Sequence, residues 1–222
     1  MNEIIQILNQ IDTQIFLFFN GMHTTFGDYF MSIFTGKWIW VPMYASILFV
    51  LFKNYDWKVV LGCIVTIALT ITFADQVCAS LIRPAVERYR PSNLNSPIVD
   101  LVHIVNDRRG GQYGFPSCHA SNSFGLALYV ILVFRKRWLS LFIVSWAIVN
   151  CYTRIYLGLH YPGDLLVGGL VGCTGAYLFY WLLCRYTDYQ KKEEIKYAYT
   201  PIYVALFIVT GILIYSTLKV IG

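Results

Sequence analysis

Three short segments of the chain hold the residue types that bind and transfer phosphate. They are RPAVERYRP at 83–91, PSCH at 116–119 and TRIYLGLHYPGD at 153–164. Arginine guanidinium groups match phosphate oxygens in bidentate pairs, and a helix that begins at PSCH would present N–H groups to an anion. Histidine can act as a nucleophile or as a general acid near neutral pH. The segments together indicate phosphoryl transfer, which needs mainly positioning and positive charge.

The spacing within the third segment suggests a catalytic pair. Asp164 follows His160 by four residues, and Pro162 between them is well placed in the first turn of a helix. A carboxylate that bonds one ring nitrogen fixes the tautomer and leaves the other nitrogen free to attack. Arg83, Arg90 and Arg154 would supply the positive charge, because arginines at a membrane surface are costly unless they bind something anionic.

The composition places these residues in a membrane protein. Of the 222 residues, 57% are hydrophobic and only 13% are charged, which is too apolar for an ordinary soluble domain. We predict an all-α, polytopic helix bundle that forms a single domain over residues 1–222. Six apolar segments are candidate transmembrane helices: 37–53, 58–82, 118–134, 138–157, 164–184 and 201–219. Apolar residues recur at helical spacing in 3–19 among polar ones, which predicts an amphipathic helix in the membrane interface, with a seventh short span as the alternative.

The order of the spans brings the three segments together. If the chain crosses the membrane at each span, the segments 83–91, 116–119 and 153–164 all lie at one face. The opposite face holds short basic connections, whose residues are Lys53, Lys58, Arg135, Lys136, Arg137, Arg185, Lys191, Lys192 and Lys196. Basic residues in short loops favour the cytoplasm. We therefore expect the long loop 83–115 and the site to face away from the cytoplasm.

Some of these residues could also have other functions. Cys118 could be a thiol nucleophile, but Phe124 stands where such phosphatases carry an arginine six residues later. Cys118, His119 and His160 could in principle bind zinc, although their spacing is not a known ligand pattern.

Asp75 lies within a span, where a carboxylate can mark the pathway of an anion transporter or channel; the alternative is a buried contact with Asn150 or Thr153. No basic tract with interleaved aromatic residues indicates a nucleic-acid partner, and no pair of cysteines suggests a disulfide framework.

The pattern Arg83-x6-Arg90-Pro91, Pro116-Ser117-Cys118-His119 and Arg154-x5-His160-x3-Asp164 resembles the type 2 phosphatidic acid phosphatase superfamily. The usual family motifs are KxxxxxxRP, PSGH and SRxxxxxHxxxD, and their internal spacings are kept over 83–164. Three positions depart from them: Arg83 replaces Lys, Thr153 replaces Ser, and Cys118 replaces Gly. The last change places a side chain where backbone approaches phosphate. A soluble vanadate haloperoxidase has a similar anion site, but six spans argue against it.

The resemblance implies a role for each site residue. His160 would be the nucleophile that forms a phosphohistidine, Asp164 would orient it, and His119 would protonate the leaving oxygen. The phosphate would be held by Arg83, Arg90, Arg154, Ser117 and Cys118. No metal and no cofactor are expected.

The resemblance also limits the substrate and the location. The implied partners are the bilayer and a phosphorylated lipid. The segments GKWIWVP, RPAVERYRP and FPSCHASNSFG look most like small bacterial members that remove a phosphate of lipid A. Undecaprenyl diphosphate is the next candidate, followed by phosphatidylglycerol phosphate. The expected location is the bacterial inner membrane, with the site facing the periplasm or exterior.

Overall fold

The computed structural model describes residues 2–222 and is helical throughout them, with one isolated β-bridge between Tyr89 and Tyr113 and no strand in this part of the chain. The α-helices are α1 (Asn2–Asn20), α2 (Thr25–Phe34), α3 (Val41–Asn54), α4 (Trp57–Asp75), α5 (Arg83–Val86), α6 (Cys118–Phe134), α7 (Arg137–Tyr156), α8 (Pro162–Tyr186) and α9 (Thr200–Ile221). Shorter elements are the 3₁₀-helices η1 (Trp38–Trp40) and η3 (Val99–Leu101) and the π-helix η2 (Gln76–Ile82). The all-α class is confirmed.

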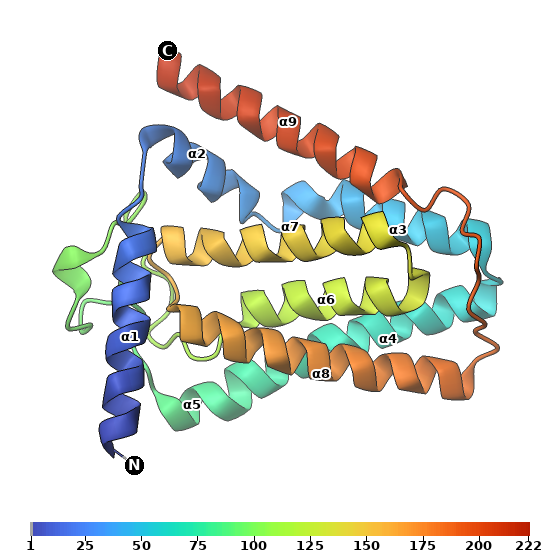
Figure 1. Ribbon diagram of the computed structural model, residues 1–222, viewed down its shortest axis with the longest axis horizontal. Helices are drawn as coiled ribbons and strands as arrows, with labels where there is room; N and C mark the ends of the chain where they lie inside the picture. Colours follow the sequence, from blue (N-terminus) through green and yellow to red (C-terminus); the bar gives the residue numbers. More distant parts are fainter. Residues whose placement is uncertain (1) are drawn as a thin grey trace.

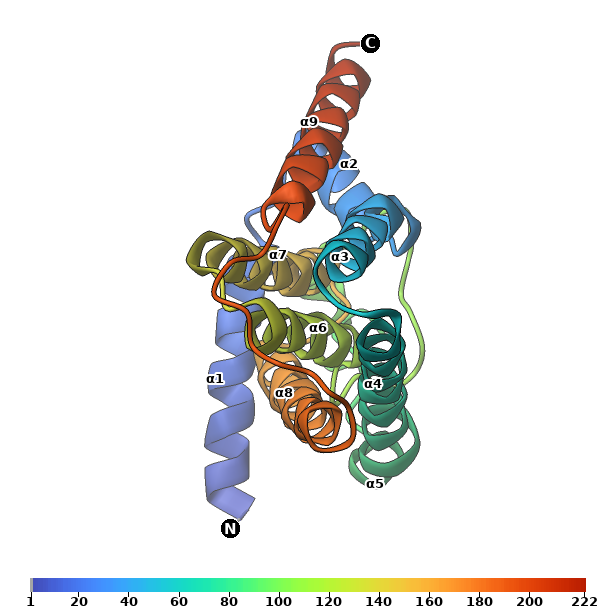
Figure 2. The ribbon, with the colours of Figure 1, turned by 90° about the vertical axis from the view of Figure 1, so that its right-hand side faces the viewer.

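Helix α6 lies at the centre of the bundle, between α7 and α8 and beside α4 (Figures 1 and 2). Glycines let α8 approach it closely. A Cβ atom added at Gly168 would collide with the Ser117 backbone, and one at Gly172 would collide with the Ser121 backbone. Close approach of this kind is typical of helix packing in membranes. The two glycines therefore pack helices within one chain and hold the start of α6 against the start of α8.

Within residues 2–222, four stretches are long and apolar enough to cross a membrane: Trp57–Val86, which joins α4, η2 and α5, together with α7, α8 and α9. Helices α2 and α3 make a fifth only if the pair, bent by 67°, is one span. The sequence predicts a transmembrane span over 37–53. The structure instead begins α3 at Val41 and places the unpredicted α2 before the bend, which the Trp40 side chain closes by donating to the Phe34 carbonyl at 2.8 Å.

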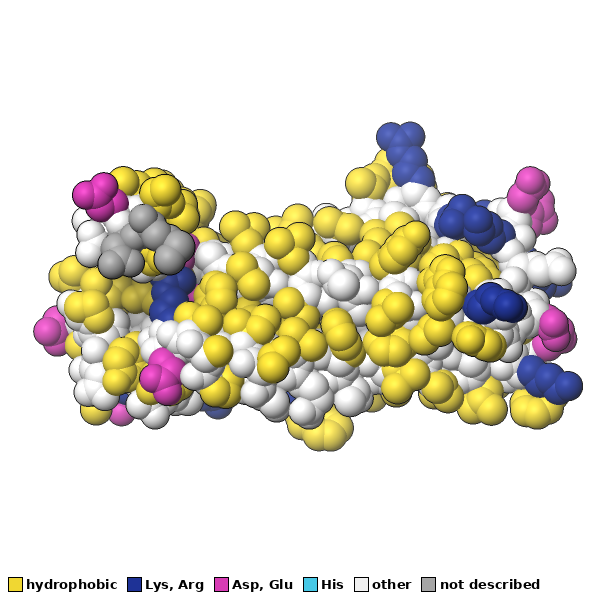
Figure 3. Space-filling model, turned by 90° about the horizontal axis from the view of Figure 1, so that it is seen from below, with side chains coloured by type: hydrophobic (Ala, Val, Ile, Leu, Met, Phe, Trp, Pro, Cys, Tyr) yellow, Lys and Arg dark blue, Asp and Glu magenta, His cyan; other side chains and the backbone are white. Residues whose placement is uncertain are grey.

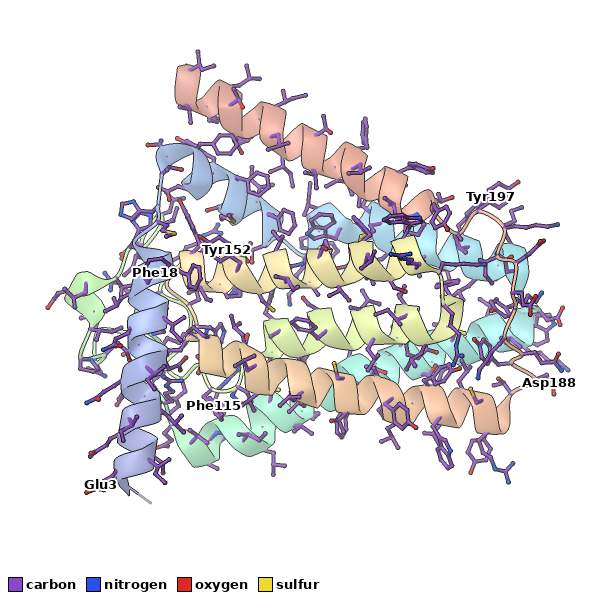
Figure 4. All side chains as sticks on the ribbon, in the orientation of Figure 1. Glu3, Phe18, Phe115, Tyr152, Asp188 and Tyr197 are labelled. Carbon is purple, nitrogen blue, oxygen red and sulfur yellow. The ribbon has the colours of Figure 1, made fainter. Side chains whose placement is uncertain are left out.

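The surface shows the bands that a membrane requires. Apolar side chains cover the middle of the molecule in Figure 3, and Lys and Arg gather at one end. This end carries the loops at 135–137 and 187–199, and Asp188 and Tyr197 mark it in Figure 4. Phe115 and Tyr152 lie at the opposite end, where the three phosphate-type segments meet. The short basic loops therefore lie at the end opposite the phosphate-type segments, as the alternation of spans predicts.

Helix α1 lies across the end of the bundle, nearly perpendicular to α6, α7 and α8 in Figure 1. Phe16 is fully buried against the bundle, but Ile4, Leu8 and Phe18 are each at least 60% exposed. An apolar surface of this kind is suited to lipid. The helix also makes one polar contact with α8, in which Asp12 Oδ1 accepts a hydrogen bond from the Gly163 N–H at 2.7 Å.

Candidate phosphate site

The three segments predicted from sequence meet at one end of the bundle. Ser117, just before α6, donates its N–H to the carbonyl of Asp164 in the first turn of α8 at 2.9 Å. Arg83, where η2 ends, donates to the carbonyl of Pro116 at 2.9 Å and lies 3.1 Å from the sulfur of Cys118. The Arg83 N–H bonds the Cys78 carbonyl five residues back. This π-type turn, a feature frequent at functional sites, sets the direction in which the side chain leaves the helix.

His160 is held from both sides of its ring. Its Nδ1 lies 3.3 Å from Asp164 Oδ2, and its Nε2 lies 2.7 Å from Nη1 of Arg90. A guanidinium only donates, so Nε2 must carry the lone pair and Nδ1 the proton that points to Asp164. His160 is 2% exposed. The dyad predicted from spacing is present, with Nε2 as the nitrogen that can attack.

The electrostatic surroundings keep His160 neutral. Burial, reinforced by the charges of Arg90 and Arg154, lowers the pKa of His160 well below its ordinary value of 6.5. Burial also lowers the pKa of Arg90 to about 10, with a further contribution from Arg83. At neutral pH the imidazole is therefore unprotonated at Nε2, whose lone pair accepts from Arg90, and the guanidinium groups beside it stay charged. A nucleophile for phosphorus needs both properties.

Asp164 is positioned by the start of α8. Pro162 takes the first helical position, and Asp164 Oδ2 accepts a hydrogen bond from the N–H of Tyr161 at 3.0 Å. This is half of a capping box. The carboxylate therefore satisfies an N–H group of the helix start and fixes the ring of His160 with the same oxygen.

His119 lies in the first turn of α6 and contacts α7. Its Nε2 lies 3.1 Å from Oδ1 of Asn150. The sequence offers Asn150 as a partner of Asp75, and the structure corrects this. Asp75 instead accepts from Asn122 at 3.0 Å, because these two residues face each other between α4 and α6. Thr153, the other candidate partner of Asp75, donates to the carbonyl of Asn150 at 2.6 Å.

The three arginines share one feature. Within residues 2–222, the Nε atoms of Arg83, Arg90 and Arg154 are each buried without a hydrogen-bond partner. A buried donor left unsatisfied costs about 1–3 kcal/mol, and more when it is charged. Arg154 is anchored by Nη1, which donates to Thr35 Oγ1 at 2.8 Å just after α2. Three guanidinium groups, each with a buried and unsatisfied Nε donor, are arranged to receive an anion with several oxygens.

Arg88 is a site residue that the sequence does not single out. Its Nη1 lies 2.9 Å from Asp164 Oδ1 and 2.7 Å from Asp12 Oδ2. Its guanidinium stacks over the Tyr161 ring, 3.9 Å from the centroid. The sequence does hold one signal for Arg88. It and Arg90 flank Tyr89, and in an extended stretch residues on either side of one residue point the same way. The contribution of Asp12 to Arg88 has no such signal, since it comes from α1, which is distant from Arg88 in the chain.

An apolar groove begins beside His119. It has a volume of about 570 Å³ and is lined by side chains from α3, α4, α6 and α7. Most of the lining is aliphatic or aromatic, and the polar side chains that line it are Thr35, Lys37, Asp75, His119, Asn122, Ser123 and Asn150. Groups of three or more His, Cys, Asp or Glu side chains in metal-binding geometry do not occur within residues 2–222. Cys118, His119 and His160 thus do not form the alternative zinc site there.

The comparisons with known proteins agree with these observations. Residues 64–188 match the family described as the PAP2 superfamily. A protein of Bacteroides thetaiotaomicron, "Lipid A 4'-phosphatase", is 57% identical over 97% of this chain and 99% of its own length. A protein of the same description from Porphyromonas gingivalis is 33% identical over 77% of this chain and 72% of its own. The crystal structure of Aquifex aeolicus LpxE has the same fold, with a TM-score of 0.56 and 21% identity over 76% of this chain and 93% of that one.

Proposed function

Because the chain belongs to the PAP2 superfamily, we propose that it is a membrane lipid phosphatase whose substrate is a phosphate of lipid A. The observation that carries this proposal is the set of three arginines whose buried Nε atoms lack a partner in residues 2–222, beside a neutral histidine. The description of the 57% identical relative supports lipid A as the substrate. The apolar groove beside His119 supports a lipid as the leaving group.

The proposed reaction has two steps. Nε2 of His160 attacks the phosphorus, the bond from phosphorus to the lipid oxygen breaks, and His119 gives a proton to that oxygen. Water then attacks the phosphohistidine, His119 takes a proton from the water, and inorganic phosphate leaves with His160 restored. Asp164 holds the Nδ1 proton and stabilises the charge that develops on the ring.

The phosphate is held by the start of α6 and by arginines. Arg83, Arg90 and Arg154 donate to its oxygens, and the first N–H groups of α6 around Ser117 and Cys118 add to them. Arg90 donates to Nε2 of His160 in this structure. When phosphate arrives, its oxygens compete for this guanidinium, and Nε2 is released in the direction of the phosphorus. The substrate thus frees the nucleophile that attacks it.

The same proposal includes the arrangement in the membrane. We infer one integral-membrane domain over residues 1–222 with six spans: the bent pair α2–α3, the stretch α4–η2–α5, the shorter apolar α6, and then α7, α8 and α9. Helix α1 would lie in the interface, where its exposed apolar residues meet lipid. The phosphate site would face the periplasm, across the inner membrane from the basic loops.

Thiol labelling in spheroplasts tests the orientation. A cysteine is placed at exposed Asn95 near the site or at exposed Lys191 at the basic end. The background carries Cys184→Ser, because Cys184 is the exposed native cysteine. We expect an impermeant reagent to label Asn95→Cys only. Labelling of Lys191→Cys only would overturn the orientation.

Phosphate release from a panel of lipids tests the reaction. Purified protein in detergent is given lipid A, undecaprenyl diphosphate and phosphatidylglycerol phosphate. We expect the highest kcat/KM with lipid A, and inhibition by vanadate, which mimics the transferred phosphoryl group. A preference for undecaprenyl diphosphate would reassign the substrate. Binding without phosphate release from any of the lipids would support the anion transporter instead.

A further inference from the structure

We propose that Asp75 and Asn122 form a recognition site for a hydrogen-bond donor on the leaving group, such as an amide N–H or a hydroxyl of an acylated sugar. The inference rests on the proposed function and deepens it. It makes these two residues determinants of which lipid phosphate the protein accepts. Neither belongs to the three phosphate-type segments, and the proposed reaction uses neither.

The pair has acceptor capacity that the protein does not use. Asp75 Oδ1 accepts from Asn122 Nδ2 at 3.0 Å. Within residues 2–222 no group donates a hydrogen bond to the second carboxylate oxygen of Asp75, and Oδ1 of Asn122 is buried without a partner. A carboxylate in an apolar part of a membrane protein is costly unless it is paired. A ligand that supplies N–H or O–H donors would satisfy this site.

The pair also lies where a leaving group must pass. Both residues line the apolar groove, and so does His119. His119, Asn122 and Leu126 follow one face of α6, because residues three and four apart in a helix are neighbours. Asn122 is three residues further along than His119, a rise of about 4.5 Å. A sugar ring whose oxygen is protonated by His119 would thus reach Asp75 and Asn122 with its next substituents.

The chemistry of this pair discriminates between lipid classes. Lipid A is an acylated amino sugar and presents amide and hydroxyl donors, whereas an undecaprenyl chain is a hydrocarbon and presents none. A site built to bond a donor rejects the analogue that lacks it, because its own buried polar groups are then left unpaired. The aliphatic remainder of the groove can hold hydrocarbon from either lipid.

The test compares Asp75→Asn with the parent on lipid A and on undecaprenyl diphosphate. In this variant the amide oxygen still accepts from Asn122, so the NH₂ group faces the substrate donor. We expect kcat/KM to fall about 10- to 100-fold with lipid A and less than about 3-fold with undecaprenyl diphosphate. Exposed Asp100→Asn, the same chemical change outside the groove, should leave both values unchanged. An activated aryl phosphate, which is small and soluble, reports whether the variant is folded.

The outcomes separate this inference from the proposed function. Equal losses with both lipids, or no loss with lipid A, would overturn the role of Asp75 while lipid A stays the substrate. A parent that cleaves undecaprenyl diphosphate but not lipid A would overturn both. If Asp75→Asn is inactive towards the aryl phosphate, Asn122→Ala takes its place and must show the same selective loss with lipid A.

Discussion

Helices α6 and α8 both begin at the phosphate site, but their N-termini are satisfied in different ways. The start of α8 already holds two carboxylates: Asp164 accepts from the N–H of Tyr161, and Asp12 accepts from that of Gly163. At the start of α6 the N–H of Ala120 bonds the hydroxyl of Ser117 at 3.4 Å. Carboxylates do not bond this turn in residues 2–222, and Arg83 lies beside it.

The difference indicates that the two helix starts have different roles at the same end of the bundle. A helix start carries partial positive charge and attracts anions. At α8 the protein supplies its own anions, and these fix Arg88 and His160. At α6 the positive charge is left for the substrate. We therefore expect substitutions at the start of α8 to affect the nucleophile, and those at the start of α6 to affect phosphate binding and protonation of the leaving group.

The largest expected effect is at His160, the proposed nucleophile, which is held by the start of α8. His160→Ala removes the atom that attacks phosphorus, so we expect kcat to fall by about 10⁴-fold or more. Phosphate release from lipid A measures this, and the unfolding temperature in detergent shows that the variant is folded. Activity within about 10-fold of the parent would rule out His160 as the nucleophile.

His119 at the start of α6 provides the contrast. His119→Ala should lower activity by about 10²- to 10⁴-fold with the lipid, because a general acid is lost. The loss should be much smaller with an activated aryl phosphate, whose leaving group needs no proton. If the two substrates lose activity equally, His119 does not act as the acid.

Arg88→Ala should have the next largest effect, because within residues 2–222 Arg88 bonds Asp164 and makes no hydrogen bond to His160. Arg88→Ala leaves Asp164 with one charged partner fewer, and we expect kcat to fall about 10²-fold with KM little changed. Arg88→Lys should recover part of the loss through its charge. Exposed Arg108→Ala in the same loop is the control. A rise in KM with kcat unchanged would place Arg88 on the substrate instead.

The stability of the protein should depend on pH through His160. Its pKa is held well below 6.5 in the folded chain, so the unfolded chain takes up a proton first as the pH falls. The folded state is then destabilised below pH 6.5, by up to about 1.4 kcal/mol per pH unit, and is unaffected above it. His160→Gln cannot take up this proton. Its unfolding temperature should fall less than that of the parent between pH 7 and pH 5, and parallel curves would contradict the argument.

The smallest expected effect is at Cys118, the first residue of α6. The residue is helical, so glycine is not required there. Its sulfur contacts Arg83 at 3.1 Å, and a serine hydroxyl can replace that contact. We expect Cys118→Ser and Cys118→Gly to keep kcat within about 10-fold of the parent. Losses above about 10²-fold in both would make Cys118 the nucleophile candidate again.

The sequence by itself determined the local geometry of the histidine and the carboxylate at this site. The spacing from Arg154 to His160 and Asp164 is local, so a helix that begins at Pro162 places the carboxylate beside the ring. Composition and apolar runs gave the helical class, and the alternation of spans predicted that three distant segments would meet at one end. These features depend on residues close together in the chain or on the bilayer, both of which can be read without coordinates.

Only the tertiary structure decided which groups from distant helices complete the site. Asp12 reaches Arg88 because α1 crosses the end of the bundle, and Thr35 reaches Arg154 because α2 bends away from α3. Asp75 faces Asn122, and not Asn150, because of how α4 and α6 are rotated against each other. Such contacts are set by packing between helices, and neither hydrophobic periodicity nor the spacing of motifs records the rotation of one helix relative to another.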